Sequence, residues 1–486
     1  MTDLMVVGAY FAVMLTVGWR ARTRSPEAYW VAGRSGRPLP VAASLVATIF
    51  GASSTVGLVG LAYGRGLTGA WWSLVGGLAL VPFALVLAPR VRRLGVITLP
   101  DILERAYGAR VAMAGALVVA LAWCGVVAAQ IVAGGLLLGG IFHLPLQGAL
   151  AMVAAVFVLY TFWGGQPSVI RTDAWQLVLF CVALLATLAL VLRSVLAGEP
   201  GSAELPTGFL SFPVSADFGW YQVLVFYPLI VGLPYLVGPD IYSRVLCARD
   251  ENTARRAGLV AAGMVVLLSF ALAILGVLIR ARFPGLHPEG ALPEAVMALA
   301  PAGLKGLIVA GLLGAVMSSA DTTLISAATI LSRNVVSPLA NGALRGGGPT
   351  RLGPDRQLAL TRVLVVVVGA VAWSISAFHQ GIIASLLLAY TVFVGGVVLP
   401  TLASFWRERL GVTSAGAFWA VVLGGGCAVL GSVGGGTVLA GVLGEAGSAF
   451  LKGALGPGWA SLLPLLVSAL ALVGIGRLRS RAQPRR

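Results

Sequence analysis

The sequence predicts an all-α membrane protein with thirteen transmembrane helices. Of its 486 residues, 58% are hydrophobic and only 10% are charged, whereas about a quarter of the residues in soluble domains are charged. Apolar segments of membrane-spanning length recur along the whole chain, for example at 111–142 and 175–192. A helix satisfies its own backbone hydrogen bonds, so each such segment can cross the roughly 30 Å hydrocarbon core.

Hydropathy and helix-breaking residues place the individual helices. In chain order they are expected near 3–20, 40–64, 69–89, 111–140, 145–163, 173–195, 219–243, 257–281, 302–331, 357–378, 382–406, 413–433 and 457–476. The stretch 1–18 has neither a basic start nor a small-residue cleavage site. It is therefore predicted to be a membrane helix and not a signal peptide.

The positions of the basic residues support this count and predict an orientation. With the N-terminus outside, alternate connections are cytoplasmic, and they hold all but six of the 33 Lys and Arg residues. This is the positive-inside pattern, which predicts a cytoplasmic C-terminus. The expected location is a bacterial inner membrane. Because the basic residues are spread over many connections, the net charge of +16 does not indicate nucleic-acid binding.

No catalytic constellation is found in the sequence. The four cysteines lie in or beside apolar spans, where they are expected to pack, and the three histidines fall in outer connections: Cys124, Cys181, Cys247, Cys427, His143, His287 and His379. The sequence therefore predicts no enzyme, no organic cofactor and no metal other than a transported ion.

Among the connections, 292–299 is expected to form a short amphipathic helix and 431–456 a loose glycine-rich connector.

Glycine and proline interrupt two of the predicted helices. The second carries three glycines and three hydroxyl residues at 51–60, and the seventh has two glycines and two prolines at 232–239. Such breaks expose carbonyls and amides near the membrane centre. Their separation by five helices is that of an inverted repeat in a transporter, although glycine and proline can also serve helix packing.

The ninth predicted helix carries a polar run at 318–323. Its hydroxyls and free carbonyls would suit sodium, a hard cation that prefers oxygen ligands. The alternative is that these hydroxyls bond to carbonyls of the preceding turn. Asp321 lies clearly within the membrane and is therefore a candidate functional residue. The alternative is that its carboxylate caps a kink or pairs with a cytoplasmic arginine. Asp173 and Asp240 are expected near the inner boundary.

Three motifs resemble the sodium:solute symporter family over nearly the whole chain. They are Tyr29-Trp30-Val31-Ala32-Gly33-Arg34, then Gly164-Gly165-Gln166 followed by Thr172-Asp173-Ala174-Trp175-Gln176, and Ala315-Val316-Met317-Ser318-Ser319. The resemblance implies a leucine-transporter-type core built from two inverted repeats of five helices. That core would cover 40–408, with repeats near 40–195 and 219–408. One helix and a cytoplasmic loop would precede it at 1–39, and two peripheral helices with a basic tail would follow at 409–486.

The resemblance also implies binding residues. The sodium ligands would be the carbonyls of Ala52, Thr55 and Ala315 and the hydroxyls of Ser318 and Ser319. A possible second cation site would involve Asp173, Asp321 and Thr322. The expected solute pocket is formed by Ser53, Ser54, Trp123, Gln130 and Tyr235. Proline is disfavoured as the solute, because members that carry it have aspartate at Ser54 and aromatic residues at Val126 and Val231.

The function implied is sodium-coupled symport of an amino acid, sugar or carboxylate by alternating access. The protein is expected to act as a monomer in the lipid bilayer, with solute and sodium as its partners. Two alternatives remain: proton coupling through Asp321 or Asp173, and a sensor that does not transport. The short basic segment after the last predicted helix disfavours a sensor, since it holds no output domain.

Overall fold

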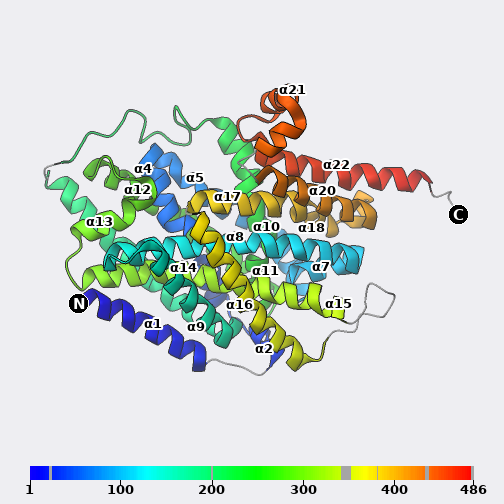
Figure 1. Cartoon of the computed structure of the whole chain (residues 1–486), viewed down its shortest axis with the longest axis horizontal. Coiled ribbons are helices and arrows are strands. Elements are labelled where there is room, and N and C mark those ends of the chain that lie inside the picture. The colour runs from blue at the N-terminus through cyan, green and yellow to red at the C-terminus, as the bar shows by residue number, and fades with distance from the viewer. Residues whose placement is uncertain (21–24, 199–200, 341–351, 380, 433–436, 483–486) are drawn as a thin grey trace.

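The computed structural model describes residues 1–20, 25–198, 201–340, 352–379, 381–432 and 437–482. In these residues the regular structure is helical apart from two isolated β-bridges. The helices form an elongated bundle in which α1 (Thr2–Arg20) begins at one end and α22 (Trp459–Ala482) extends toward the other (Figure 1). The predicted all-helical fold is confirmed.

The first half of the chain forms α2 (Pro26–Val31), α3 (Pro38–Ile49), α4 (Leu58–Arg65), α5 (Trp71–Pro82), α6 (Ala88–Leu94), α7 (Leu99–Tyr107), α8 (Ala109–Phe142) and α9 (Leu146–Leu196). The second half forms α10 (Leu233–Val237), α11 (Pro239–Cys247), α12 (Glu251–Arg282), α13 (Ala291–Leu299), α14 (Leu304–Ile330), α15 (Ser337–Ala340), α16 (Pro354–Phe378), α17 (Ile382–Phe393), α18 (Leu399–Ser404), α19 (Arg407–Leu410), α20 (Ser414–Ser432) and α21 (Thr437–Leu455). Short π-helical or 3₁₀ segments join several of them into longer spans.

Ten stretches of helix in the described ranges are long and apolar enough to cross a membrane, and an eleventh results if the bent pair Leu443–Leu455 and Trp459–Ile475 is one span. Two of the ten, Ser53–Leu94 and Leu146–Leu196, contain 42 and 51 residues. As straight helices of 1.5 Å per residue they would measure about 63 and 77 Å, roughly twice the hydrocarbon thickness or more. Gly66 and Gly165 leave helical geometry inside them. Each of these two stretches contains residues of two predicted helices. This is one reason why the described structure has ten stretches where the sequence predicts thirteen helices.

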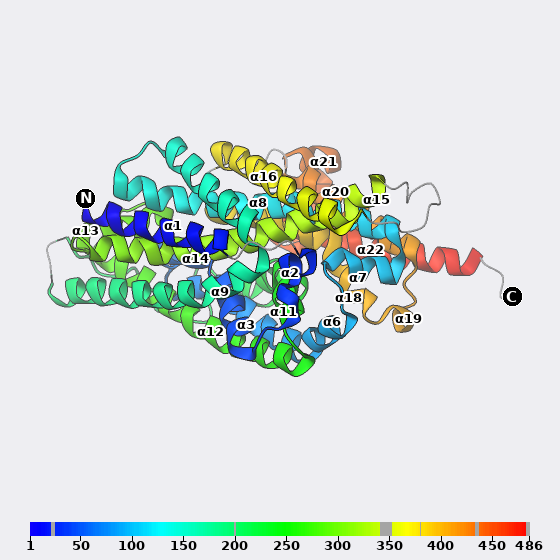
Figure 2. The same ribbon diagram turned by 90° about the horizontal axis from the view of Figure 1, so that it is seen from below.

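Gly165 divides α9 into two arms. Its φ of 62° and ψ of −168° are not helical, and Pro167 follows it. A Cβ at this position would lie 2.4 Å from the ring of Tyr29, so glycine is needed both for the backbone conformation and for the approach of α2. Figure 2 shows the arms of α9 running in different directions.

Both predicted helix interruptions are confirmed. In the first interruption, α3 ends before Phe50, whose φ of −82° and ψ of 53° are not helical. Helical structure resumes at Ser53. Gly238, with ψ 131°, separates α10 from α11. A Cβ on Gly238 would lie 2.7 Å from the carbonyl oxygen of Pro234, so the break requires a residue without a side chain. Both interruptions leave backbone groups without helical partners.

The core of the bundle contains α14. Every residue from 308 to 330 is buried, and the helix packs against α1, α8, α9 and α16 (Figure 2). Small residues permit this close packing: a Cβ on Gly311 would lie 2.7 Å from the carbonyl oxygen of Leu179 on α9. The polar run 318–323 is therefore enclosed by other helices and does not face lipid.

Two expectations about the connections have different outcomes. The short helix predicted at 292–299 is confirmed as α13. The loose connector predicted at 431–456 is wrong in its larger part, because α21 occupies Thr437–Leu455, although residues 433–436 lie outside the described ranges. The alanines and leucines of this segment favour helix strongly enough to outweigh its glycines, with Gly444 alone leaving helical geometry.

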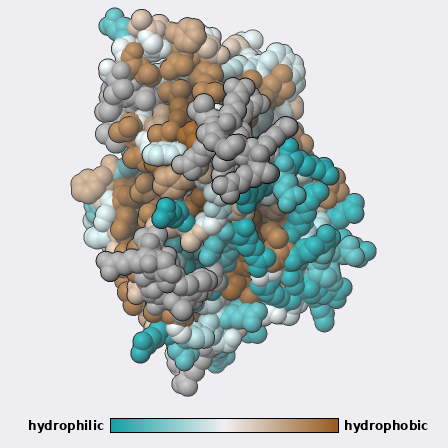
Figure 3. Space-filling model, turned by 90° about the vertical axis from the view of Figure 1, so that its right-hand side faces the viewer, coloured by the Kyte–Doolittle hydropathy of each residue, from teal (hydrophilic) through white to brown (hydrophobic). Residues whose placement is uncertain are grey.

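One end of the bundle is hydrophilic. The amphipathic helix α7 lies there together with α15, α18 and the C-terminal part of α22 (Figure 1). Figure 3, which views this end, shows a broad area of hydrophilic residues. The N-terminus of α7 is held by a capping box in which Thr98 and Asp101 each accept a hydrogen bond from the other's backbone.

Replacing Gly165 with alanine is expected to lower the melting temperature of the purified protein more than replacing Gly198. Both residues have φ +62°, but nothing lies within 4 Å of a Cβ on Gly198. We expect Gly198→Ala to cost about 1 kcal/mol through the backbone alone, and Gly165→Ala roughly 2–4 kcal/mol because it also overlaps Tyr29. Equal melting temperatures for the two variants would contradict a packed bend at Gly165.

Candidate functional site

The first interruption makes direct contact with the polar run of α14 and with α8. The hydroxyl of Ser319 donates to the carbonyl of Thr48, and the amide of Ala52 donates to Oε1 of Gln130 at 2.7 Å. A Cβ on Gly51 would lie 2.4 Å from Oγ of Ser319 and 2.6 Å from Oε1 of Gln130. The glycine is thus required because two polar side chains approach the unwound backbone.

The other residues expected to bind sodium lie around this contact. The hydroxyl of Thr55 donates to the carbonyl of Gly51 at 2.7 Å, and the carbonyl of Ala52 accepts the amide of Gly57 at 3.0 Å. Ala315 is buried on α14, one turn before Ser319. Carbonyl and hydroxyl oxygens therefore surround the interruption, and these are the atoms that hard cations prefer.

A cavity of about 490 Å³, including its opening, lies between the two broken helices, α8, α14 and α17. It is lined by Thr48, Ile49, Ser53, Trp123, Val126, Gln130, Pro234, Tyr235, Asp240, Ile241, Ser319, Thr323, Leu386 and Tyr390. Four of the five expected pocket residues are among them. The fifth, Ser54, is not, and its side chain bonds to that of Tyr235 instead.

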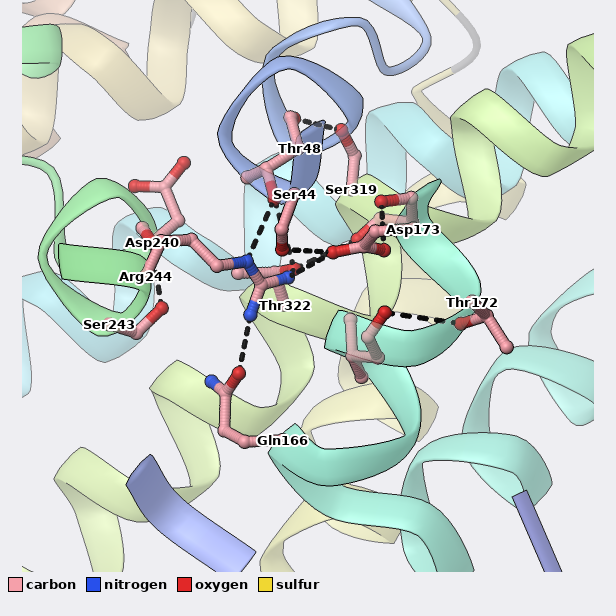
Figure 4. A network of polar contacts seen from close by, with 12 residues as sticks. Ser44, Thr48, Gln166, Thr172, Asp173, Asp240, Ser243, Arg244, Ser319 and Thr322 are labelled. Carbon is pink, nitrogen blue, oxygen red and sulfur yellow. Dashed lines mark hydrogen bonds and ion pairs between the residues drawn. The ribbon is translucent and has the colours of Figure 1, made fainter. Parts of the chain in front are cut away.

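A buried ion pair lies beside the cavity. Nη2 of Arg244 is 3.3 Å from Oδ2 of Asp173, and both side chains are fully buried. Asp173 also accepts hydrogen bonds from the hydroxyls of Ser318, at 2.6 Å, and of Ser44. Figure 4 shows Ser44 of α3, Asp173 of α9 and Arg244 of α11 pointing toward one another.

The guanidinium of Arg244 has three further partners. It donates to the hydroxyls of Thr48, at 3.2 Å, and Thr322, and to Oε1 of Gln166 (Figure 4). Removing two charges from water costs several kcal/mol per ion, so a buried pair needs this many additional hydrogen bonds. The cluster links the second interrupted helix to the first, to the bend of α9 and to α14.

The expected position of Arg244 is wrong. The sequence pattern assigned it to a cytoplasmic connection at 244–256, but α11 continues to Cys247 and Arg244 is completely buried. One signal could have indicated this: Arg244 follows Asp240 by four residues, which places both on one helix face next to the break. Ser44 and Thr48 also belong to this cluster but were not among the expected site residues, because hydroxyls are common in helices otherwise made of small apolar residues.

Asp321 is held apart from this cluster. Its Oδ1 accepts a hydrogen bond from Thr161 at 2.9 Å, and Oδ2 has no hydrogen-bond partner among the described residues. The carbonyl of Thr161 accepts the hydroxyl of Tyr29 at 3.0 Å. Of the three residues expected to form a second cation site, Asp173 and Thr322 meet at Arg244, whereas Asp321 faces the first arm of α9.

Separate contacts join the helices at both ends of the site. At one end, Asp101 of α7 pairs with Arg333 at 3.6 Å and accepts a hydrogen bond from Asn334 at 2.9 Å. At the other, the carboxylate of Glu289 accepts the amide of Ile382 at 3.0 Å, at the start of α17. These contacts tie the ends of neighbouring helices together above and below the cavity.

Comparisons with known proteins agree with this architecture. The model of the Sodium:solute symporter family matches residues 29–424. The chain is 28% identical over 480 residues to sodium/myo-inositol cotransporter 2 of Oryctolagus cuniculus, covering 87% of this chain and 68% of that protein. It is 26% identical over 480 residues to human sodium/glucose cotransporter 4, covering 88% and 68%.

Two solved structures share the fold. One is a substrate-bound, outward-open Na⁺-coupled sialic acid symporter, with a TM-score of 0.72, 15% identity and 98% of both chains covered. The other is a nucleobase-cation-symport-1 family transporter, with a TM-score of 0.57, 15% identity and coverage of 94% and 95%. The fold is therefore leucine-transporter-like, and the protein is a transporter and not an enzyme. The chain belongs to the sodium:solute symporter family and is a multi-pass, sodium-coupled solute symporter.

Proposed function

We propose that the protein carries a neutral, polyhydroxylated solute together with sodium by alternating access. The observation that carries this proposal is the cavity between the two interrupted helices, whose wall is shared with the oxygen-rich contact at Ser319. A ligand that contacts both interrupted helices can bias their arrangement, and a coupling ion acts only through its different affinity for the two states.

The residues that line the cavity favour a neutral, polyhydroxylated solute. Its lining, among the described residues, contains no lysine, arginine or histidine and one carboxylate, that of Asp240, so an anionic solute would find no basic side chain to pair with. Trp123, Tyr235 and Tyr390 offer apolar ring faces, and Gln130 offers amide hydrogen bonds. A sugar or polyol has matching apolar and hydroxyl surfaces. The relatives named for myo-inositol and glucose favour this class over amino acids and carboxylates.

We propose that sodium binds at the first interruption through the carbonyls of Ala52, Thr55 and Ala315 and the hydroxyls of Ser318 and Ser319. The contact of Ser319 with Thr48 supports this site, because it brings α14 against the unwound backbone. In the present arrangement Ser318 donates to Asp173, so its hydroxyl would have to turn from the carboxylate to the ion.

A second cation position at Asp173 and Thr322, with Asp321 on the next face of α14, is also proposed. Arg244 bonds to both Asp173 and Thr322, so a cation could bind there only after the guanidinium moves away. Arg244 lies on α11, whose Asp240 and Ile241 line the cavity. A solute that moves α11 would thereby change access to the cation position.

Proton coupling is a second candidate, favoured by the buried Asp321, whose Oδ2 has no partner in the described ranges. Uptake into vesicles that carry only a sodium gradient or only a pH gradient separates the two mechanisms. The sodium gradient alone is expected to drive accumulation.

The topology proposed is thirteen crossings with the N-terminus outside and the C-terminus inside a bacterial inner membrane. The bend at Gly165 supports two crossings in Leu146–Leu196, and the break at Gly66 separates a crossing that begins in α3 from the one that contains α5. The corresponding organisation is a first helix and loop at 1–39, a ten-helix core at 40–408 and two peripheral helices at 409–486. The protein is proposed to act as a monomer.

Ser318→Ala and Ser319→Ala are expected to raise the sodium concentration for half-maximal uptake roughly 5- to 30-fold, since each removes one oxygen ligand worth about 1–2 kcal/mol. Uptake by proteoliposomes over a range of sodium concentrations measures this. Ser269→Ala is the matched control, because that buried hydroxyl bonds, among the described residues, only to the carbonyl of Val265 in its own helix. Sodium dependence unchanged in both site variants would exclude the assignment.

Removing one partner of the buried ion pair is expected to be more damaging than removing both. Asp173→Asn or Arg244→Gln leaves an uncompensated buried charge and should destabilise the protein by about 3–5 kcal/mol. The double variant should recover a large part of this loss. Melting temperatures of the four proteins in one detergent test the coupling, and purely additive losses would show that the two side chains act independently.

Sugars and polyols are expected to raise the melting temperature in sodium but not in potassium, because a ligand that binds only the folded state stabilises it by mass action. Amino acids and carboxylates serve as comparison sets. In Tyr235→Ala, which removes a ring that lines the cavity, the shift should shrink. A carboxylate as the strongest sodium-dependent ligand would refute the neutral-solute proposal while leaving sodium coupling intact.

A further inference from the structure

A strongly basic hollow lies at the hydrophilic end of the bundle, away from the solute cavity. It measures about 940 Å³ including its open mouth and is formed where α6 and α7 meet α18 and α19. Figure 2 shows these four helices together at this end. Four arginines line it: Arg90, Arg105, Arg407 and Arg409.

The positive charge of this hollow is not balanced. Glu408 is the acidic residue among its lining residues, and no ion pair in the described ranges includes any of the four arginines. Nearby Arg93 differs, because it pairs with Glu251 at 2.6 Å. Four arginines held close together with one carboxylate repel one another, so a bound anion would relieve the repulsion.

Backbone contacts hold three of the guanidiniums in place. Arg90 donates to the carbonyl of Val86 at 3.1 Å. Arg105 donates to the carbonyl of Leu94 at 2.6 Å, and Arg407 donates to the carbonyls of Val412, at 3.3 Å, and Ala106. A guanidinium has five N–H donors, so each of these side chains keeps several for an anion. The hollow is therefore a partly preorganised set of donors.

An apolar recess continues from the basic hollow. It shares Arg90, Arg105, Ala106, Ser404 and Phe405 with the hollow and adds Leu94, Ile102 and Arg93, for about 760 Å³ including its opening. Beside it, the guanidinium of Arg90 lies 5.2 Å from the ring centre of Trp406. A cluster of charge donors next to an apolar recess and a tryptophan matches the headgroup and upper acyl chain of a lipid.

We propose that this hollow binds the phosphate headgroup of an anionic phospholipid. Arginine binds phosphate oxygens through paired, charge-assisted hydrogen bonds, and basic pockets between membrane helices are suited to such headgroups. The apolar recess distinguishes a lipid from free phosphate, which would make no use of Leu94, Ile102 and Phe405. The bound lipid connects α6 and α7 with α18 and α19, and so joins helices from both proposed repeats.

The test uses the purified full-length protein, whose bound lipids are counted by native mass spectrometry and whose melting temperature is followed during titration. The probes are phosphatidylglycerol, phosphatidylcholine with the same acyl chains, and inorganic phosphate. The site variant is Arg90→Gln/Arg409→Gln. The matched control, Arg255→Gln/Arg256→Gln, removes the same charge from exposed positions on α12.

Wild type and control are expected to bind phosphatidylglycerol in preference to phosphatidylcholine, and the site variant to bind it roughly tenfold more weakly. Equal weakening in site variant and control would reduce the effect to general surface charge and overturn the proposal. An equal response of wild type to inorganic phosphate would overturn the lipid assignment, as would a lack of preference between the lipids. If the double variant does not fold, Arg409→Gln alone provides the comparison, because its side chain makes no hydrogen bond in the described part of the chain.

Discussion

A helix that is interrupted inside a membrane leaves backbone groups that must find partners within the protein, since lipid offers none. This constraint organises the centre of the structure. The carbonyl of Thr48 is satisfied by Ser319 and the amide of Ala52 by Gln130, so the first interruption requires α14 and α8 to be polar where they touch it. The polar residues of the site and the broken helices therefore depend on each other.

The second interruption is tied into the same centre by charge. Arg244 extends from α11 to Asp173, Thr48, Thr322 and Gln166, and thereby connects four segments that are far apart in sequence. Two buried carboxylates, Asp173 and Asp321, lie near this single arginine. Asp240, four residues before Arg244, adds a third carboxyl group, so the described part of this centre has more carboxyl groups than basic side chains. Their oxygens are ligands that a cation can use in a symporter.

The structural relatives show how little sequence identity this arrangement needs. The sialic acid symporter superposes over 98% of the chain at 15% identity. Helix packing through small residues, as at Gly311 against α9, tolerates many apolar substitutions provided that the backbones can still approach. Within the cavity, Gln130 and Ser319 bond to the unwound backbone, so these two side chains serve the fold as well as the pocket.

Four of the five residues that the family resemblance implied for the pocket line the cavity. The sequence alone determined the helical membrane fold, the two interruptions and the position of the polar run of α14 inside the membrane. These follow from local causes: hydropathy, the conformations open to glycine and proline, and the cost of polar groups in lipid. Only the tertiary structure decided that Arg244 is buried on Asp173, that Ser318 and Ser319 turn to different partners and that Asp321 lies with Thr161. It also decided that 437–455 is helical. These features depend on which segments meet in space. An arginine near a helix end, such as Arg244, is expected to be exposed as long as the carboxylate that it contacts, here that of Asp173, is far away in the sequence.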